Sequence, residues 1–134
     1  MVKAIIENDD ILIRRLQIGM DNAYKYYRQD RKNYPEIENY ARLTDLWEFK
    51  NTPEAEIRSS GYVVDTLEAA VWCLVNSESY SEAVLKAVNL GSDTDTVAAV
   101  TGGLAGLYYG IEGIPEEWVA SIQRKEWIDE IIAK

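Results

Sequence analysis

The chain has 134 residues, which fits one domain, and its net charge of −9, from 23 acidic and 14 basic residues, argues against a nucleic-acid partner. It has no histidine and a single cysteine, so an internal disulfide is excluded and a reducing, cytoplasmic location is expected. No apolar run approaches the length of about 18–20 residues that a membrane span needs, and the N-terminus lacks the pattern of a signal peptide.

The first 58 residues contain one long helical pattern followed by shorter pieces. Asp9 or Asp10 can cap a helix that runs to about Arg28, because apolar residues recur there at spacings of three and four. Residues 29–34 are polar and predict a loop, and Pro35 fits the first turn of a short helix. A compact apolar cluster then precedes a break at residues 51–53; its members are Leu43, Leu46, Trp47 and Phe49.

The second part of the chain predicts four more helical segments. The first runs from residue 62 to about Asn76, and the second is introduced by a capping-box spacing between Ser79 and Glu82. An almost wholly apolar helix follows over residues 97–109, and Pro115 opens a C-terminal helix with a break near Lys125. No strand-like alternation extends beyond a few residues. The sequence therefore predicts a single compact all-α domain over residues 1–134.

The apolar helix contains a stripe of small residues. Ala98, Gly102, Gly106 and Gly110 are spaced four apart, and Gly103 is a further glycine in the same helix. Each glycine inside a helix costs about 1 kcal/mol relative to alanine, so an offsetting benefit is expected. A stripe without side chains lets another helix backbone approach closely. The pattern predicts a central, buried helix.

Residues 91–96, which we call the acidic turn, concentrate oxygen ligands between two predicted helices. Asp93, Asp95 and Thr96 exceed what a helix N-terminus needs for capping, although capping alone remains the simpler alternative. Carboxylate and hydroxyl oxygens suit hard cations such as Mg²⁺ or Mn²⁺. The spacing does not fit an EF-hand loop. Three other carboxylates, Asp45, Asp65 and Glu68, are candidates by composition only, and Asp65 and Glu68 are better explained as solvated or first-turn charges.

Three ordered blocks of sequence, residues 60–70, 87–96 and 98–106, resemble the C-terminal half of ADP-ribosylglycohydrolases, with the likeness running over about residues 59–127. The resemblance implies an all-α fold and hydrolysis of the glycosidic bond between ADP-ribose and an acceptor, with two Mg²⁺ or Mn²⁺ ions. It implies that the metal ligands are Asp93, Asp95 and Thr96. It also implies that the residues near ADP-ribose are Ser60, Gly61, Tyr62, Asn89, Gly91 and Ser92. For Tyr62, a half-buried aromatic at a helix start is nearly as strong an alternative.

The chain departs from the family pattern because it lacks the Thr-Asp-Asp metal motif expected in the N-terminal part. Half of the metal ligands are then missing, and no catalytic residue can be assigned. One hypothesis is a truncated hydrolase that needs a complementing N-terminal polypeptide. Another is a non-catalytic helical binding or assembly module, with the surface left by the missing part serving as an oligomer interface. A third is a homodimer that pools two acidic turns.

Overall fold

The computed structural model describes residues 1–133, which form helices and connecting turns without a strand in that range. The all-α expectation is confirmed. Within these residues, no helix combines the length and the apolar character needed to cross a membrane. The helices are α1 Val2–Glu7, α2 Leu12–Tyr27, α3 Tyr34–Glu38, α4 Leu46–Phe49, α5 Val63–Val75, α6 Tyr80–Asn89, α7 Thr94–Tyr109, α8 Glu116–Ala120 and α9 Lys125–Ile132.

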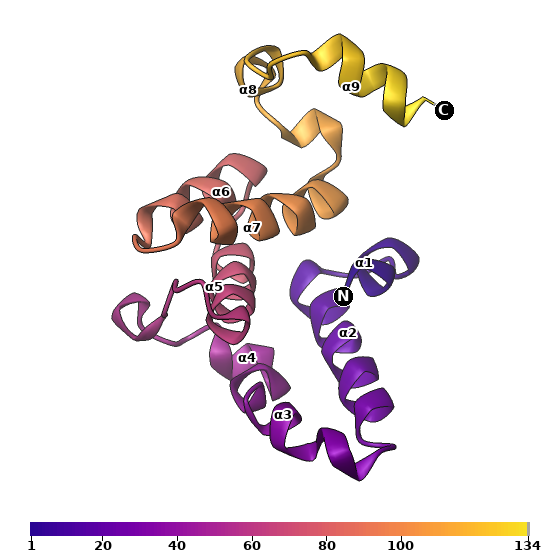
Figure 1. Ribbon diagram of the computed structural model, residues 1–134, viewed down its shortest axis with the longest axis vertical. Coiled ribbons are helices and arrows are strands. Elements are labelled where there is room, and N and C mark those ends of the chain that lie inside the picture. The colour runs from indigo at the N-terminus through magenta and orange to yellow at the C-terminus, as the bar shows by residue number, and fades with distance from the viewer. Residues whose placement is uncertain (134) are drawn as a thin grey trace.

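Helix α5 occupies the centre of the arrangement (Figure 1). Helices α6 and α7 form a hairpin that packs against α5, and α1 packs against both α2 and α7. The short helices α3 and α4 link α2 to α5, while α8 and α9 extend beyond the hairpin (Figure 1). The acidic turn lies between α6 and α7, so its position is fixed by the packing of this hairpin on α5.

The hydrophobic core is built around α5, in which every residue from Glu68 to Val75 is buried. Leu16 of α2, Leu46 of α4 and Val97 of α7 pack into the same core. Burial of each such side chain contributes about 1.5–3 kcal/mol. The expected apolar cluster before residue 51 is confirmed for Leu43, Leu46 and Phe49 but not for Trp47, which is 50% exposed. Trp47 lies on the outer side of α4, a helix too short to bury both faces.

The small-residue stripe of α7 does face another helix, as expected. A methyl group at Gly102 would lie 3.2 Å from the hydroxyl oxygen of Tyr80, and one at Gly106 would lie 3.9 Å from the same ring, so α6 approaches α7 over these glycines. Gly103 instead faces open space. The expectation of a buried helix is wrong in part, because Gly103, Ala99 and Leu107 are exposed. Helix α7 has one packed face and one free face.

Some helix ends agree with the expectations from sequence and others differ. The Ser79 hydroxyl accepts a hydrogen bond from the amide of Glu82 at 3.2 Å, which confirms the predicted cap of α6. Helix α2 begins at Leu12 without a side-chain cap; Asp10 accepts instead from the amide of Ile11, one residue before the helix. The expected break near Lys125 is confirmed, because α8 ends at Ala120 and α9 begins at Lys125, after Arg124 in a left-handed conformation with φ of 55°. Helix α1 was not anticipated, since six residues carry too weak a helical pattern.

Candidate functional site

The acidic turn is a tight connection between α6 and α7. Gly91 and Ser92 both have positive φ, at 82° and 57°, which reverses the chain direction in two residues. Glycine tolerates positive φ without steric cost. Positive φ is uncommon for a residue with a Cβ atom, such as Ser92, and marks a tight turn here. The chain then enters α7 at Thr94, with Asp93 as the residue before the helix. The turn presents its polar side chains at the N-terminal end of a 16-residue helix.

The Asp93 side chain does not act as an ordinary helix cap. Within the described residues it accepts no hydrogen bond from the backbone of α7; its Oδ1 accepts from the hydroxyl of Thr96 at 3.0 Å. Asp93 is half-buried, while Asp95 and Thr96 are exposed. The positive end of the helix dipole favours negative charge at this place. Asp93 and Thr96 therefore share one cluster of oxygens that backbone capping does not consume.

A second segment, residues 59–62, lies directly against the acidic turn, and we call it the 59–62 loop. The amide of Asp93 donates to the carbonyl of Ser59 at 2.9 Å, and the Ser59 hydroxyl donates back to the carbonyl of Gly91 at 2.7 Å. Gly61 comes so close that a methyl group there would lie 2.8 Å from Asp93 Oδ2. Two segments that lie 32 residues apart at the Ser59–Gly91 hydrogen bond thus form one surface.

The residues predicted to lie near a ligand come mostly from these two segments. Tyr62 is the residue before α5 and its side chain is 53% exposed, while Gly91 and Ser92 are exposed in the turn. Asn89 is the last residue of α6, and its side chain is exposed. The structure brings the 59–62 loop and the acidic turn together, with Asn89 entering the turn from α6.

The oxygen donors of the turn suit a hard divalent cation but form an incomplete set. Mg²⁺ and Mn²⁺ prefer carboxylate, hydroxyl and water oxygens, about six in all. In the described part of the chain, no group of three or more histidine, cysteine, aspartate or glutamate residues is placed to hold a metal ion. Asp45 is used elsewhere, because its carboxylate caps α4 by accepting from the amides of Trp47 and Glu48. The donors fit such a metal only as part of a larger site.

Glu68 corrects a further expectation, since it is not a solvated charge but 5% exposed. Its Oε2 accepts from Arg42 Nη1 at 2.7 Å. Burial raises the pKa of the Glu68 carboxyl, and the Arg42 guanidinium opposes that rise in part. The sequence feature that could have indicated the burial of Glu68 is its position as a single carboxylate inside the otherwise apolar run of residues 67–75.

Asp65 is not a free charge either, because it accepts a hydrogen bond from the Ser60 hydroxyl.

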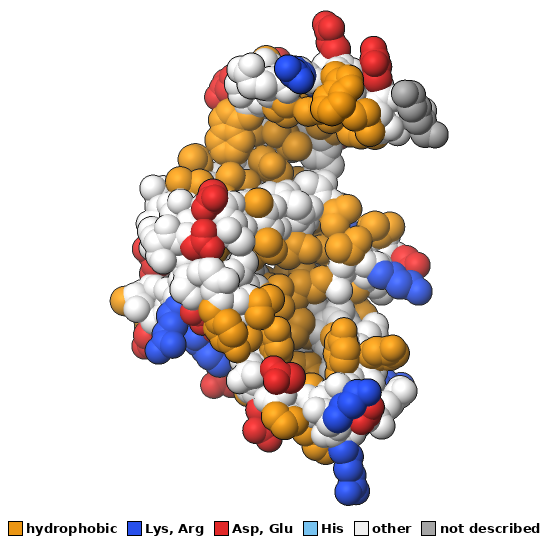
Figure 2. All heavy atoms as spheres, viewed as in Figure 1, with side chains coloured by type: hydrophobic (Ala, Val, Ile, Leu, Met, Phe, Trp, Pro, Cys, Tyr) orange, Lys and Arg blue, Asp and Glu red, His pale blue; other side chains and the backbone are white. Residues whose placement is uncertain are grey.

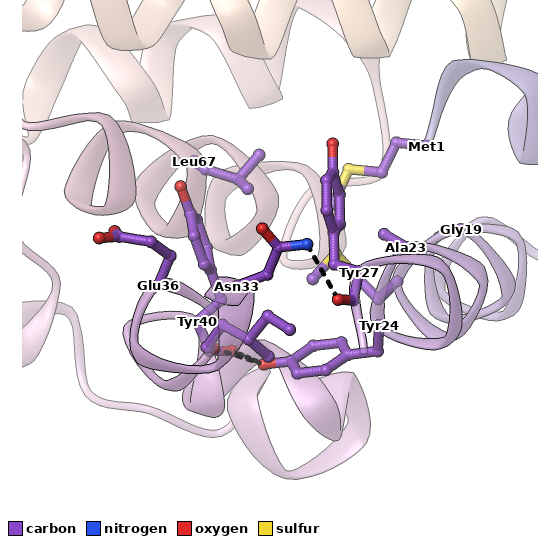
Figure 3. A pocket seen from close by; sticks show the side chains of 11 residues that line it. Met1, Gly19, Ala23, Tyr24, Tyr27, Asn33, Glu36, Tyr40 and Leu67 are labelled. Atoms are coloured by element: carbon purple, nitrogen blue, oxygen red, sulfur yellow. Dashed lines mark hydrogen bonds between the residues drawn. The ribbon is translucent and has the colours of Figure 1, made fainter. Parts of the chain in front are cut away.

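Sequence reasoning missed an apolar pocket of about 580 Å³ between α2, α3 and α5 (Figure 3). Tyr24, Tyr27 and Tyr40 line it together with Leu67 of α5. The Tyr24 hydroxyl donates to the carbonyl of Tyr40 at 2.6 Å, which ties α2 to the segment after α3. Hydrophobic side chains gather in this hollow (Figure 2). The tyrosines that recur from residue 24 to 40 are the signal that could have indicated it.

Comparison with known proteins assigns the chain to a family. The chain matches the ADP-ribosylglycohydrolase family over residues 1–134, beyond the segment in which we expected the likeness. It is 46% identical over 89 residues to an ADP-ribosylarginine hydrolase, Tri1, from Serratia proteamaculans, covering 66% of this chain and 24% of that protein. It is 34% identical over 68 residues to the ADP-ribosyl-[dinitrogen reductase] glycohydrolase of Rhodospirillum rubrum, covering 51% and 23% respectively.

A similar match is found in a mammalian protein. The ADP-ribosylhydrolase ARH3 of Bos taurus is 41% identical over 51 residues, which is 38% of this chain and 14% of that protein. The matched segments thus span about a quarter or less of these relatives. The match over the whole sequence shows that this chain belongs to the ADP-ribosylglycohydrolase family.

Proposed function

We propose that the chain supplies one part of a metal-dependent ADP-ribosylglycohydrolase site, which hydrolyses the glycosidic bond between ADP-ribose and an acceptor when complemented by the missing N-terminal part. The observation that carries the proposal is the direct contact between the 59–62 loop and the acidic turn. Both segments belong to the blocks that resemble the family. The acceptor class is open, and ADP-ribosylated arginine is the first to test because the Serratia relative is named for it.

Asp93, Asp95 and Thr96 are the proposed ligands for Mg²⁺ or Mn²⁺. A bound ion of this kind would supply Lewis-acid chemistry, which can polarise a water molecule or stabilise developing charge at the scissile bond. The chain's own contribution is the hydrogen-bonded pair of Asp93 and Thr96 at the N-terminus of α7, with Asp95 in the first turn of the same helix. The helix dipole favours anions at this end, so carboxylates are needed there to hold a cation. Ser60, Gly61 and Tyr62 are proposed to line the ADP-ribose pocket. The backbone of Asn89, Gly91 and Ser92 is proposed to lie close to the same ligand.

The other ligands are proposed to come from a second polypeptide that carries the family's N-terminal metal motif. Three oxygens are about half of what Mg²⁺ or Mn²⁺ requires. The relatives that match here are about four times longer than the matched segments, and they therefore have sequence from which such ligands can come. A chain of this kind would be inactive alone and active when the two parts are combined.

The test combines metal binding with a complementation assay. The chain is titrated with Mn²⁺ and then with ADP-ribose by calorimetry, and hydrolysis of ADP-ribosylated arginine is measured with and without the N-terminal part of the Serratia relative. We expect hydrolysis only in the mixture, and its loss in Asp93→Asn. Asp129→Asn in the exposed helix α9 is the matched control and should keep the activity of the mixture. Activity of the chain alone would overturn the proposed incompleteness.

A second candidate function is a non-catalytic helical binding or assembly module, and the apolar pocket between α2, α3 and α5 is the observation that favours it. Large exposed apolar surfaces in soluble proteins commonly mark interaction sites. This alternative predicts self-association in sedimentation experiments with no response to Mn²⁺ or ADP-ribose. A chain that stays monomeric and binds Mn²⁺ would reject it.

A further inference from the structure

The Asp65 carboxylate contacts the 59–62 loop through the side chain of Ser60 and not through a backbone amide of the loop. It is the third residue of α5, a place where a carboxylate ordinarily accepts from the amide of the residue before the helix. Here the Ser60 hydroxyl accepts from that amide, of Tyr62, at 3.2 Å, and the same hydroxyl donates to Asp65 Oδ2 at 2.6 Å. Ser60 therefore stands between the carboxylate and the backbone of the loop.

Thr66, the next residue of α5, fixes the backbone carbonyl of Ser60. The hydroxyl of Thr66 donates to the Ser60 carbonyl at 3.1 Å, and Thr66 is buried. Both the hydroxyl and the carbonyl of Ser60 are thus fixed by consecutive residues of α5. Helix α5 is the most buried helix among the described residues, so the loop is anchored to the helix around which the core is built.

The loop in turn restricts the side chain of Asp93. Ser59 is buried and makes hydrogen bonds in both directions with the acidic turn. Gly61 then brings bare backbone against the Asp93 carboxylate, with no room for a methyl group. A shift of this loop would change the space in which that carboxylate can turn.

We propose that Asp65 is a positioning residue, which acts through Ser60 to hold the 59–62 loop against the acidic turn and so sets the direction of the Asp93 carboxylate. This inference rests on the proposed function, in which Asp93 is a metal ligand. Groups that orient metal ligands typically affect metal affinity by about 10–100-fold. Asp65 would neither touch the metal nor contact the substrate.

Calorimetric titration with Mn²⁺ alone tests the effect on the ligand. We expect Ser60→Ala and Gly61→Ala to weaken Mn²⁺ binding by about tenfold or more. Neither variant changes charge, so neither can act through a general loss of attraction for the cation. The matched controls are Ser121→Ala, in an exposed turn, and Gly103→Ala, on the free face of α7, and both should bind as the wild type does.

The pathway through Ser60 is tested by combining variants. Asp65→Asn keeps an oxygen that accepts from Ser60 and should bind Mn²⁺ better than Asp65→Ala. In a Ser60→Ala background, Asp65→Asn should cause no additional loss, because the two residues act as one unit. Additive losses, or full Mn²⁺ affinity in Ser60→Ala, would overturn the proposal.

Amide hydrogen exchange provides a readout that needs no metal. In Ser60→Ala, exchange at Asp93 and Tyr62 should accelerate, since both amides are held by the loop, while exchange in the centre of α5 stays slow. If the wild type binds no Mn²⁺, the proposed metal site fails, and exchange at Asp93 still decides whether Ser60 holds the loop. Unchanged exchange at Asp93 would overturn the inference by itself.

Discussion

At the scale of single residues, helix α5 buries two ionisable groups in different ways. Cys73 is fully buried and packs in the apolar core. Glu68 is buried as well but has a charged partner, Arg42, whose side chain is partly exposed and also lies over the ring of Phe49. A neutral thiol needs no partner, whereas a buried carboxylate without one is costly. The two residues therefore respond differently to a change of pH.

Cys73 should be inert in the folded protein. Burial raises the pKa of the Cys73 thiol to about 12, so the reactive thiolate is almost absent at neutral pH. A rise of about three pKa units corresponds to roughly a thousandfold less thiolate near pH 8. We expect a thiol reagent such as DTNB to react very slowly in buffer and rapidly in urea. Fast stoichiometric labelling of the native chain would contradict the burial of Cys73.

Replacement of Arg42 should destabilise the fold in a pH-dependent way. Burial raises the Glu68 pKa, so the folded state binds the proton more tightly than the unfolded state, and stability falls as pH rises above the ordinary glutamate range. Arg42 opposes this rise. Arg42→Met should therefore lower the free energy of unfolding by about 1–3 kcal/mol at neutral pH and by less near pH 5.

Urea denaturation at the two pH values measures this difference. Arg42→Met keeps an apolar stem over Phe49, and the double variant Arg42→Met/Glu68→Gln removes the carboxylate that titrates. We expect the double variant to lose the pH dependence that the single substitution adds. Equal destabilisation by Arg42→Met at both pH values would mean that packing, and not the charge of Glu68, determines the effect.

At the scale of elements, the helices with long apolar periodicity were predictable and the short ones were not. The spacing of apolar residues indicated α2, α5, α6 and α7, because each buries a continuous face. Helix α1 has six residues, too few for local propensity to stabilise, and it depends on packing against α2 and α7. Likewise, the partner of Glu68 lies 26 residues away, a distance that no local pattern reveals.

The contact of α1 with α2 depends on Gly19. A methyl group at Gly19 would lie 2.9 Å from the Met1 backbone and 3.4 Å from the side chain of Ala4. Alanine is favoured over glycine inside a helix by about 1 kcal/mol, but here it would push α1 away from α2. We expect Gly19→Ala to lower the free energy of unfolding by about 1–3 kcal/mol through this overpacking.

Gly103→Ala is the matched comparison, because Gly103 is also inside a helix but faces open space. It should raise the free energy of unfolding by up to about 1 kcal/mol. Both variants are measured by urea denaturation in the same buffer. A stabilisation by Gly19→Ala equal to that of Gly103→Ala would show that α1 yields to the added methyl group without cost.

At the scale of the whole molecule, the helices leave apolar surface uncovered. Figure 2 shows hydrophobic side chains in the hollow beside α2, where the pocket of about 580 Å³ lies. The acidic turn could be identified from sequence because its residues are contiguous. The pocket could not, since it forms only when α2, α3 and α5 come together. Such a surface should bind a small apolar dye in the folded state.

The dye 1-anilinonaphthalene-8-sulfonate tests this surface directly. We expect its fluorescence to rise in the presence of the native chain, and most of that rise to be lost in Ala23→Glu, which places a charge in the pocket lining. Ala99→Glu, on the free face of α7, changes the net charge equally and should retain the rise. Equal fluorescence of the two glutamate variants would instead place the dye elsewhere on the chain.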